Sequence, residues 1–168
     1  MNHSTIDGFV NAAREYCELA EQDNNVTASD LGTVRELLLR LIYHIPAIEK
    51  APHSAEFDGL GPDDSNYLRI AKRFSGFSFN FYSVIFDPHA ITPPDEPVMC
   101  MLSDDLADIY RDLAQGLDNA NKGHLAEACF DWSHSYKYHW ARHAVNALMA
   151  IEIRRTDNND EVEYNSDV

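Results

Sequence analysis

Acidic residues and two histidines in the last third of the chain have the types and the spacing of metal ligands. Asp104, Asp105 and Asp108 form a DDxxD pattern, which places carboxylate oxygens along one edge of a helix. His139 and His143 stand four residues apart, a spacing that lets two imidazoles on one helix reach the same ion. Asp105, Asp108, His139 and His143 are therefore the candidate ligands for Zn²⁺, Mg²⁺ or Mn²⁺.

A purely structural role is the commoner explanation for such residues. Acids in the first turn of a helix interact favourably with its positive end, and no second metal motif accompanies the DDxxD pattern. A histidine on an apolar helix face usually has a hydrogen-bond partner inside the protein. We therefore expect no bound metal and no cofactor, and we expect His143 to form a hydrogen bond with Asp105 or Asp108.

Two further candidates for chemistry lie on the first predicted helix. Glu15 and Glu18 form an ExxE pair like those that hold Mg²⁺ in all-α nucleotide pyrophosphohydrolases, but the next helix offers Glu36 without the ExxD motif of those enzymes. Cys17 falls on a buried stripe, where apolar surroundings disfavour the thiolate that a nucleophile needs. The sequence therefore identifies no catalytic residue.

Apolar residues recur at helical spacing along most of the chain, with glycine and proline between the runs. The runs predict helices over residues 4–23, 29–48, 65–74, 103–118 and 125–155. Pro46 predicts a kink or an end near His44, and the short turn at residues 119–123 predicts that the last two helices are antiparallel neighbours. We expect an all-α fold, an antiparallel helical bundle of five or six helices with an aromatic-rich irregular insertion.

Residues 74–86 form this insertion and carry five phenylalanines. Alternation at Phe77, Phe79 and Phe81 suits a strand, but no second strand is evident, so we expect an irregular or short helical segment. The segment has more aromatic rings than a short excursion needs, which predicts an apolar surface patch. The candidate interaction residues are Phe77, Phe79, Phe81 and Tyr82.

Three functions are open on these observations. The leading interpretation is an uncharacterised protein that acts without catalysis, through contact with an unknown protein partner or as a homodimer. The alternative is a divalent-metal-dependent enzyme built from the Asp-rich helix and the C-terminal His pair. A third interpretation places a small-ligand pocket under the aromatic segment at residues 74–86.

The chain is acidic, with 28 acidic and 13 basic residues among 168 and a formal net charge of −15. Its length fits one domain over residues 1–155, followed by an acidic tail at residues 156–168 that we expect to be disordered. The charge repels phosphate backbones and anionic membranes, so we expect neither nucleic acid nor a membrane as a partner. Three scattered cysteines and an N-terminus without an apolar leader favour the cytoplasm.

Several segments together carry a resemblance to a known family. They are FVNAAREYCELAE near the start, a Phe-Asp-Pro after the aromatic run, SDDLADIYRDLAQGL, and WSHSYKYHWARHAVNALMAI near the end. From Phe9 to Ile151 the chain resembles an uncharacterised bacterial all-helical family that is catalogued as a domain of unknown function, number 5063. The resemblance implies a helical fold in a bacterial cytoplasm, with no assigned activity and no catalytic residues to carry over.

Overall fold

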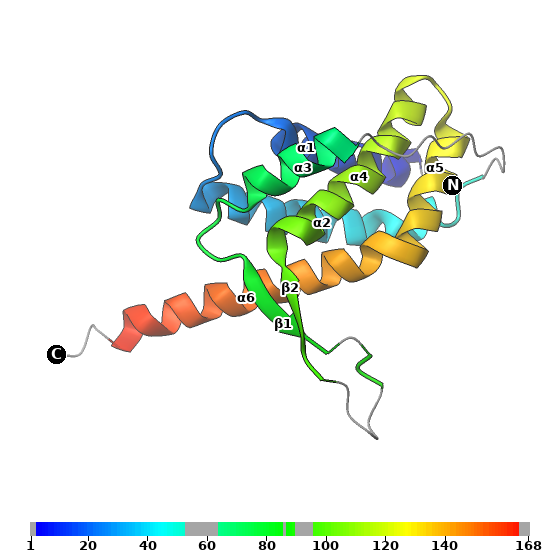
Figure 1. Ribbon diagram of the computed structural model, residues 1–168. Helices are drawn as coiled ribbons and strands as arrows, with labels where there is room; N and C mark the ends of the chain where they lie inside the picture. Colours follow the sequence, from blue (N-terminus) through cyan, green and yellow to red (C-terminus); the bar gives the residue numbers. More distant parts are fainter. Residues whose placement is uncertain (1–2, 53–63, 86, 90–95, 165–168) are drawn as a thin grey trace.

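The computed structural model describes residues 3–52, 64–85, 87–89 and 96–164. Helices dominate these residues, as the sequence predicts, and one pair of short strands accompanies them (Figure 1). The elements are α1 (His3–Glu21), α2 (Ala28–Ile48), α3 (Asp64–Phe74), β1 (Phe81–Val84), β2 (Val98–Met101), α4 (Leu102–Asn121), α5 (Leu125–Ser135), the π-helical turn η1 (Tyr136–Trp140) and α6 (Ala141–Tyr164). The all-α helical bundle is therefore confirmed.

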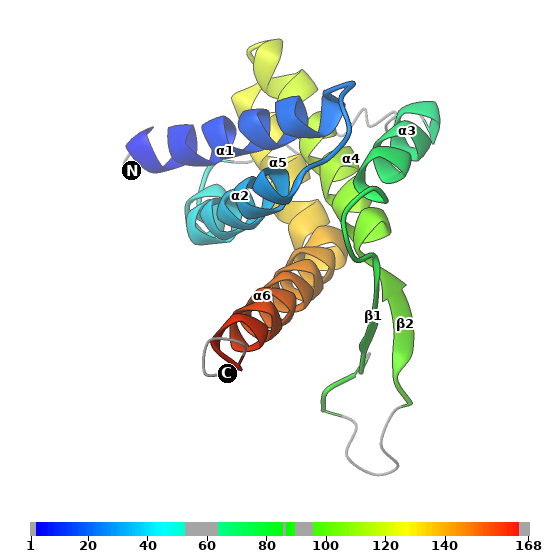
Figure 2. The ribbon, with the colours of Figure 1, turned by 90° about the vertical axis from the view of Figure 1, so that its left-hand side faces the viewer.

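Helix α4 lies at the centre of the bundle and packs against α1, α3, α5 and α6. Its apolar residues at helical spacing are fully or almost fully buried, as the pattern predicts: Leu102, Leu106, Ile109, Leu113 and Leu117. Burying each such side chain contributes about 1.5–3 kcal/mol to stability. In two perpendicular views α1 and α2 lie side by side, while α6 and the strand pair extend away from the bundle (Figure 1, Figure 2).

The long C-terminal helix of the sequence prediction is interrupted by the π-helical turn η1. Trp132 and Trp140 are both fully buried, and the ring of Phe9 lies against each of them. The two indoles are eight residues apart, whereas two α-helical turns hold about 7.2 residues. A π-helical turn holds extra chain, so it returns Trp140 to the side of the helix that Trp132 occupies.

Trp132 packs directly onto the backbone of α4. Its indole Nε1 donates a hydrogen bond to the carbonyl oxygen of Leu113 at 3.1 Å. A Cβ atom built at Gly116 would lie 2.2 Å from this Nε1, so the indole occupies the space that any other residue would fill. Gly116 weakens the helix by about 1 kcal/mol relative to alanine, and close packing of Trp132 explains its presence.

The aromatic segment contains a strand, contrary to the irregular or helical segment that the sequence predicts. Strands β1 and β2 pair antiparallel, with Tyr82 opposite Cys100 and Phe81 opposite Met101. The partner strand follows Pro97, more than ten residues further along the chain, in a stretch that the sequence analysis did not recognise as a strand. Phe86 lies outside the described residues.

Asn80, just before β1, satisfies the first backbone groups of α4. The backbone N–H of Leu102 donates to the carbonyl oxygen of Asn80 at 2.7 Å, and that of Ser103 donates to its side-chain Oδ1 at 2.8 Å. Ser103 itself is buried within the first turn of α4, whose N-cap residue is Met101. The orphan N–H groups of this helix end are therefore partly satisfied from outside the helix.

The four candidate interaction residues differ in their exposure. Phe77 is only 8% exposed and stacks on Phe74 in the core, with ring centroids 5.9 Å apart. Phe79 and Tyr82 are half-buried against the core, and only Phe81, at 63%, is largely exposed. The expectation that these rings together form a surface patch is therefore wrong for Phe77, because the turn after α3 places its ring against Phe74 in the core.

Helix α2 ends where the apolar periodicity predicts, whereas helix α6 ends later than predicted. Helix α2 continues through Pro46 to Ile48, so the proline does not end it near His44. Helix α6 continues past Arg155 to Tyr164, into the expected acidic tail, and residues 165–168 lie outside the described part of the chain. Among the helices that the structure describes, none is long and apolar enough to cross a membrane.

Gly116 and Gly32 give opposite expectations for the same substitution in a helix. We expect Gly116→Ala to lower the free energy of unfolding by about 1–3 kcal/mol, because the new Cβ forces Trp132 to move. We expect Gly32→Ala to raise it by up to about 1 kcal/mol, because nothing lies within 4 Å of a Cβ at that position. Urea unfolding measures both, and equal stability of the two variants would contradict the packing of Trp132 on Gly116.

Candidate metal centre

The antiparallel arrangement of α4 against η1 and α6 brings all four predicted metal-site residues together. The Asp108 carboxylate of α4 lies 3.8 Å from Nε2 of His139 and 3.7 Å from Nε2 of His143. One ligand atom from each of these three residues lies within 4.8 Å of the others. Asp105 is the fourth predicted residue, and it lies behind the imidazole of His143 instead of beside its Nε2 atom.

Each imidazole is held by a carboxylate on its other nitrogen. Nδ1 of His143 lies 2.7 Å from Oδ1 of Asp105, and Nδ1 of His139 lies 2.7 Å from Oδ2 of Asp112. An ionised carboxylate only accepts hydrogen bonds, so each Nδ1 carries the proton. In a neutral imidazole the lone pair is then on Nε2, on the side of the ring that faces Asp108. The predicted hydrogen bond between His143 and Asp105 is confirmed.

Two tyrosines from other elements hold the acidic edge of α4. The hydroxyl of Tyr82 in β1 donates to Oδ2 of Asp105, and the hydroxyl of Tyr67 in α3 donates to Oδ1 of Asp104. Burial first, and then the hydrogen bond to Asp105, raise the pKa of Tyr82, so its hydroxyl stays protonated as a donor. Tyr82 thus fixes the carboxylate that orients His143, a role that the sequence did not indicate.

Arg111 supplies a cationic side chain within this cluster. One of its terminal nitrogens lies 2.5 Å from Oδ1 of Asp108 and 3.4 Å from Nε2 of His139. Its guanidinium carbon lies 5.2 Å from the centre of the Tyr67 ring, a cation–π geometry. The guanidinium of Arg111 and a metal ion would therefore compete for the same two ligand atoms.

Burial and charge act in opposite directions on the two groups at the centre of the cluster. Burial lowers the pKa of His143, but the hydrogen bond that it donates to Asp105 and the charges of Asp108, Asp105 and Asp104 together raise that pKa above its ordinary value. Burial raises the pKa of Asp108, and this outweighs the opposing effects of Arg111, His143 and His139. The surrounding acids therefore favour a positive charge at His143, whereas burial disfavours the negative charge of Asp108.

Arg111 and Asp112 are the members of the cluster that the sequence analysis did not select. Asp112 follows Asp108 by four residues and Asp105 by seven, so all three share one edge of α4. Arg111 follows Asp108 by three residues and meets it on the same edge. The helical spacing of the acids could have identified Asp112, because it lies one turn beyond Asp108 on the same edge of α4.

The other two sequence candidates do not form a site of this kind. Glu15 is bound by the guanidinium of Arg40, with nitrogen–oxygen distances of 2.5 and 2.9 Å. Cys17 is buried, and burial raises the pKa of its thiol far above the ordinary value. The thiol is therefore an inert part of the core, as the sequence predicts.

We expect the pKa of His143, measured by NMR titration of its imidazole, to lie above that of a free histidine. Its contribution to the free energy of unfolding is then complete below the unfolded-state pKa of about 6.5, and it is lost as the pH rises through the folded-state pKa. Asp105→Asn should lower the measured pKa of His143, because the negative charge of Asp105 then no longer offsets the effect of burial. Asp118→Asn, an exposed change near the far end of α4, should leave it unchanged. An equal shift in both variants would contradict the role of Asp105.

Comparisons with known proteins agree with this helical architecture. The fold is similar to the crystal structure of protein BF1032 from Bacteroides fragilis, with a TM-score of 0.70 over 89% of this chain and 91% of that chain. The two sequences are 17% identical, so the likeness concerns the fold alone. None of the curated proteins matches the chain. The model of the family described as Domain of unknown function (DUF5063) matches residues 2–156, and this chain therefore belongs to that family.

Proposed function

We propose that this protein binds a divalent transition-metal ion through Asp108, His139 and His143. The observation that carries the proposal is that both imidazoles have a carboxylate on Nδ1 and direct Nε2 toward Asp108. Metal-binding histidines usually donate their other ring N–H to a carboxylate, a carbonyl or water, which fixes the tautomer and the orientation of the ring. This geometry favours the alternative of the sequence analysis over its leading interpretation.

The charge of the cluster supports a cation at this position. Four carboxylates lie along the edge of α4, at Asp104, Asp105, Asp108 and Asp112. A purely structural histidine needs one hydrogen-bond partner, whereas each of these rings has one carboxylate at Nδ1 and a second facing Nε2. A divalent ion is often the largest local charge in such a site, and here it would offset the excess of acids.

The donor set indicates which ions fit. Two imidazole nitrogens and one carboxylate oxygen suit Zn²⁺ and similar transition metals, whereas Mg²⁺ prefers oxygen ligands alone. The His143 side chain is 24% exposed and that of His139 is 36% exposed, so solvent can reach the ligands. Three protein ligands leave a coordination position for water or a substrate, as in catalytic zinc sites. This supports the metal-dependent enzyme of the sequence analysis.

We expect Zn²⁺ to raise the melting temperature of protein that has been treated with a chelator. At a free ion concentration of 100 times Kd, binding should add about 2.7 kcal/mol to the free energy of unfolding. The effect should be lost in Asp108→Asn and in His139→Gln, because each removes one ligand. His124→Gln changes an exposed histidine outside the cluster and should retain the full response to Zn²⁺. If Asp108→Asn and His139→Gln both keep the response to Zn²⁺, the ion binds elsewhere and the proposed site is wrong.

Arg111→Gln separates the metal site from a purely structural cluster. Removing the guanidinium frees Asp108 and Nε2 of His139, so we expect this variant to bind Zn²⁺ more tightly than the wild type in calorimetric titrations. In a structural cluster Arg111 is only the counter-ion of Asp108. The variant would then lose stability and still show no binding of Zn²⁺, which would contradict the proposed function.

Protein–protein contact is a second candidate function, because apolar side chains are exposed on the strand pair. We call Phe81, Ile85, Val98 and Met99 the hairpin surface, and all four are exposed. Strands β1 and β2 each pair on one side only within the described residues, and unpaired edges favour strand addition by a partner. The occupant would be another protein or a second copy of this chain.

We expect the double substitution Phe81→Ser and Met99→Ser to reduce self-association or partner binding, measured by sedimentation and by cross-linking. The helical circular dichroism spectrum should be unchanged, because both side chains are exposed. Leu68→Ser removes an equally exposed apolar side chain from α3 and serves as the matched control. If the chain is a monomer with no partner contact at the hairpin surface in the wild type, the second candidate is wrong.

A further inference from the structure

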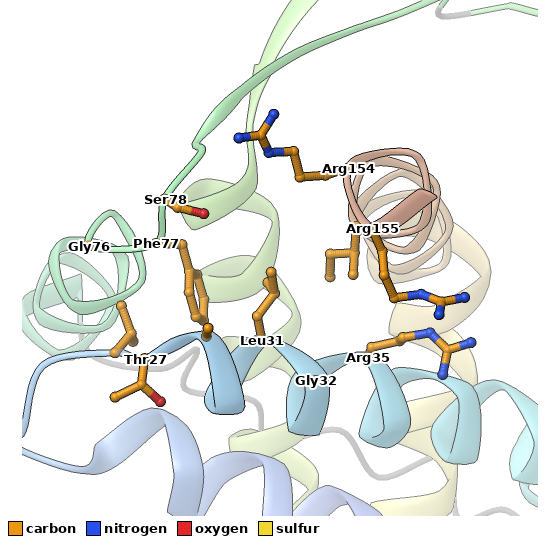
Figure 3. Close-up of a pocket in the computed structure, with 12 residues that line it drawn as sticks. Thr27, Leu31, Gly32, Arg35, Gly76, Phe77, Ser78, Arg154 and Arg155 are labelled. Carbon is orange, nitrogen blue, oxygen red and sulfur yellow. The ribbon is translucent and has the colours of Figure 1, made fainter. Parts of the chain in front are cut away.

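A separate cavity opens between the start of α2, the link from α3 to β1, and α6 (Figure 3). Its volume is about 480 Å³, which is within the range of small-molecule sites in proteins. Leu31, Phe77 and Ile151 supply its apolar walls, and Phe77 and Ile151 are themselves part of the core. We call this cavity the arginine pocket, after the three arginines that also line it, and it shares no residue with the metal cluster.

Gly32 keeps one wall of the arginine pocket open. It lies on α2 among the residues that line the cavity, and a Cβ built there meets nothing within 4 Å. A glycine inside a helix costs about 1 kcal/mol relative to alanine, and here no close packing offsets that cost. Gly116 is different, because its missing side chain makes room for Trp132. The missing side chain of Gly32 therefore leaves space in the pocket.

Positive charge is concentrated around this cavity in a strongly acidic chain. Arg35, Arg154 and Arg155 line it, although the chain has only 13 basic residues and a net charge of −15. Arg35 and Arg155 share the single carboxylate of Glu152. Arg154 has no hydrogen bond or ion pair with any residue that the structure describes. The three arginines of the lining therefore carry more positive charge than the carboxylate of Glu152 neutralises.

The positions of the side chains place this charge beside the apolar walls. In Figure 3 the guanidinium of Arg154 lies over the pocket on the side of Ser78, while those of Arg35 and Arg155 lie together at the other end. Phe77 and Leu31 lie on the opposite side of the cavity from α6, below the guanidinium of Arg154 in this view. A ligand in the cavity would thus meet apolar surface along its body and a free guanidinium at its head.

We propose that the arginine pocket binds a small organic anion with an apolar body and an oxyanion head group, a carboxylate or a phosphate. Guanidinium groups bind both head groups through paired, charge-assisted hydrogen bonds, and Arg154 is the group available for this role. Leu31, Phe77 and Ile151 contact the apolar body. This site is independent of the proposed metal centre, and either one can fail without the other.

Titrations with octanoate, octyl phosphate and 1-octanol, followed by the amide NMR signals of the protein, test this proposal. We expect both anions to bind at least tenfold more tightly than the uncharged alcohol and to shift the amides of Gly32, Gly76 and Phe77. Tighter binding of either anion supports the site, and the ranking of the two identifies the head group. Equal binding of all three probes, no binding, or shifts confined to other surfaces would overturn the proposal.

Two substitutions separate the charge from the cavity. Arg154→Gln should weaken octanoate binding at least fivefold and leave octanol unchanged, whereas Arg14→Gln, an exposed change of equal charge on α1, should affect neither. Gly32→Leu should fill the cavity and abolish binding of all three probes while the melting temperature is kept or raised, since leucine favours the helix. Full octanoate binding by Arg154→Gln, or by Gly32→Leu, would overturn the proposal.

Discussion

The contact between the indole of Trp132 and the backbone of α4 fixes how the C-terminal helices meet the centre of the bundle. Trp132 lies on Gly116 and bonds to the carbonyl of Leu113. From this point the two segments run in opposite directions, so His139 meets Asp112 and His143 meets Asp105. Residues later in η1 and α6 therefore pair with residues earlier in α4. The packing of Trp132 on α4 thus sets the register of the polar cluster.

The same register explains why acids are tolerated on a central helix. Asp105 and Asp108 are buried, and a buried charge is costly unless it is paired and hydrogen-bonded. Asp105 accepts from Tyr82 and His143, and Asp108 faces Arg111 and two imidazoles. These partners come from β1, α4, η1 and α6, so the cluster links the strand pair to the bundle. A cluster of this kind is expensive to build for stability alone, because apolar residues would pack there at lower cost.

The sequence predicts what depends on local periodicity and misses what depends on distant partners. The helix runs, the buried stripe of α4 and the pairing of His143 with Asp105 follow from spacing and from the short turn after α4. Strand β1 was missed because its partner lies beyond a proline-rich stretch, and the capping of α4 by Asn80 depends on the same long connection. The π-helical turn leaves no periodic signal, since it appears only where Trp132 and Trp140 must share one side.

Helix α6 contributes residues to both proposed sites, His143 to the metal centre and Arg154 to the arginine pocket. His143 and Arg154 are eleven residues apart, which is about 16 Å along a helix. At one end of this interval four carboxylates lie near two imidazoles. At the other end Arg35 and Arg155 share the carboxylate of Glu152, and Arg154 lies beside them in the lining of the pocket. A cation is attracted to the first site and an anion to the second, so each site discourages the ligand of the other. In a chain with a net charge of −15, the three arginines supply the local positive charge that an anion needs in order to bind.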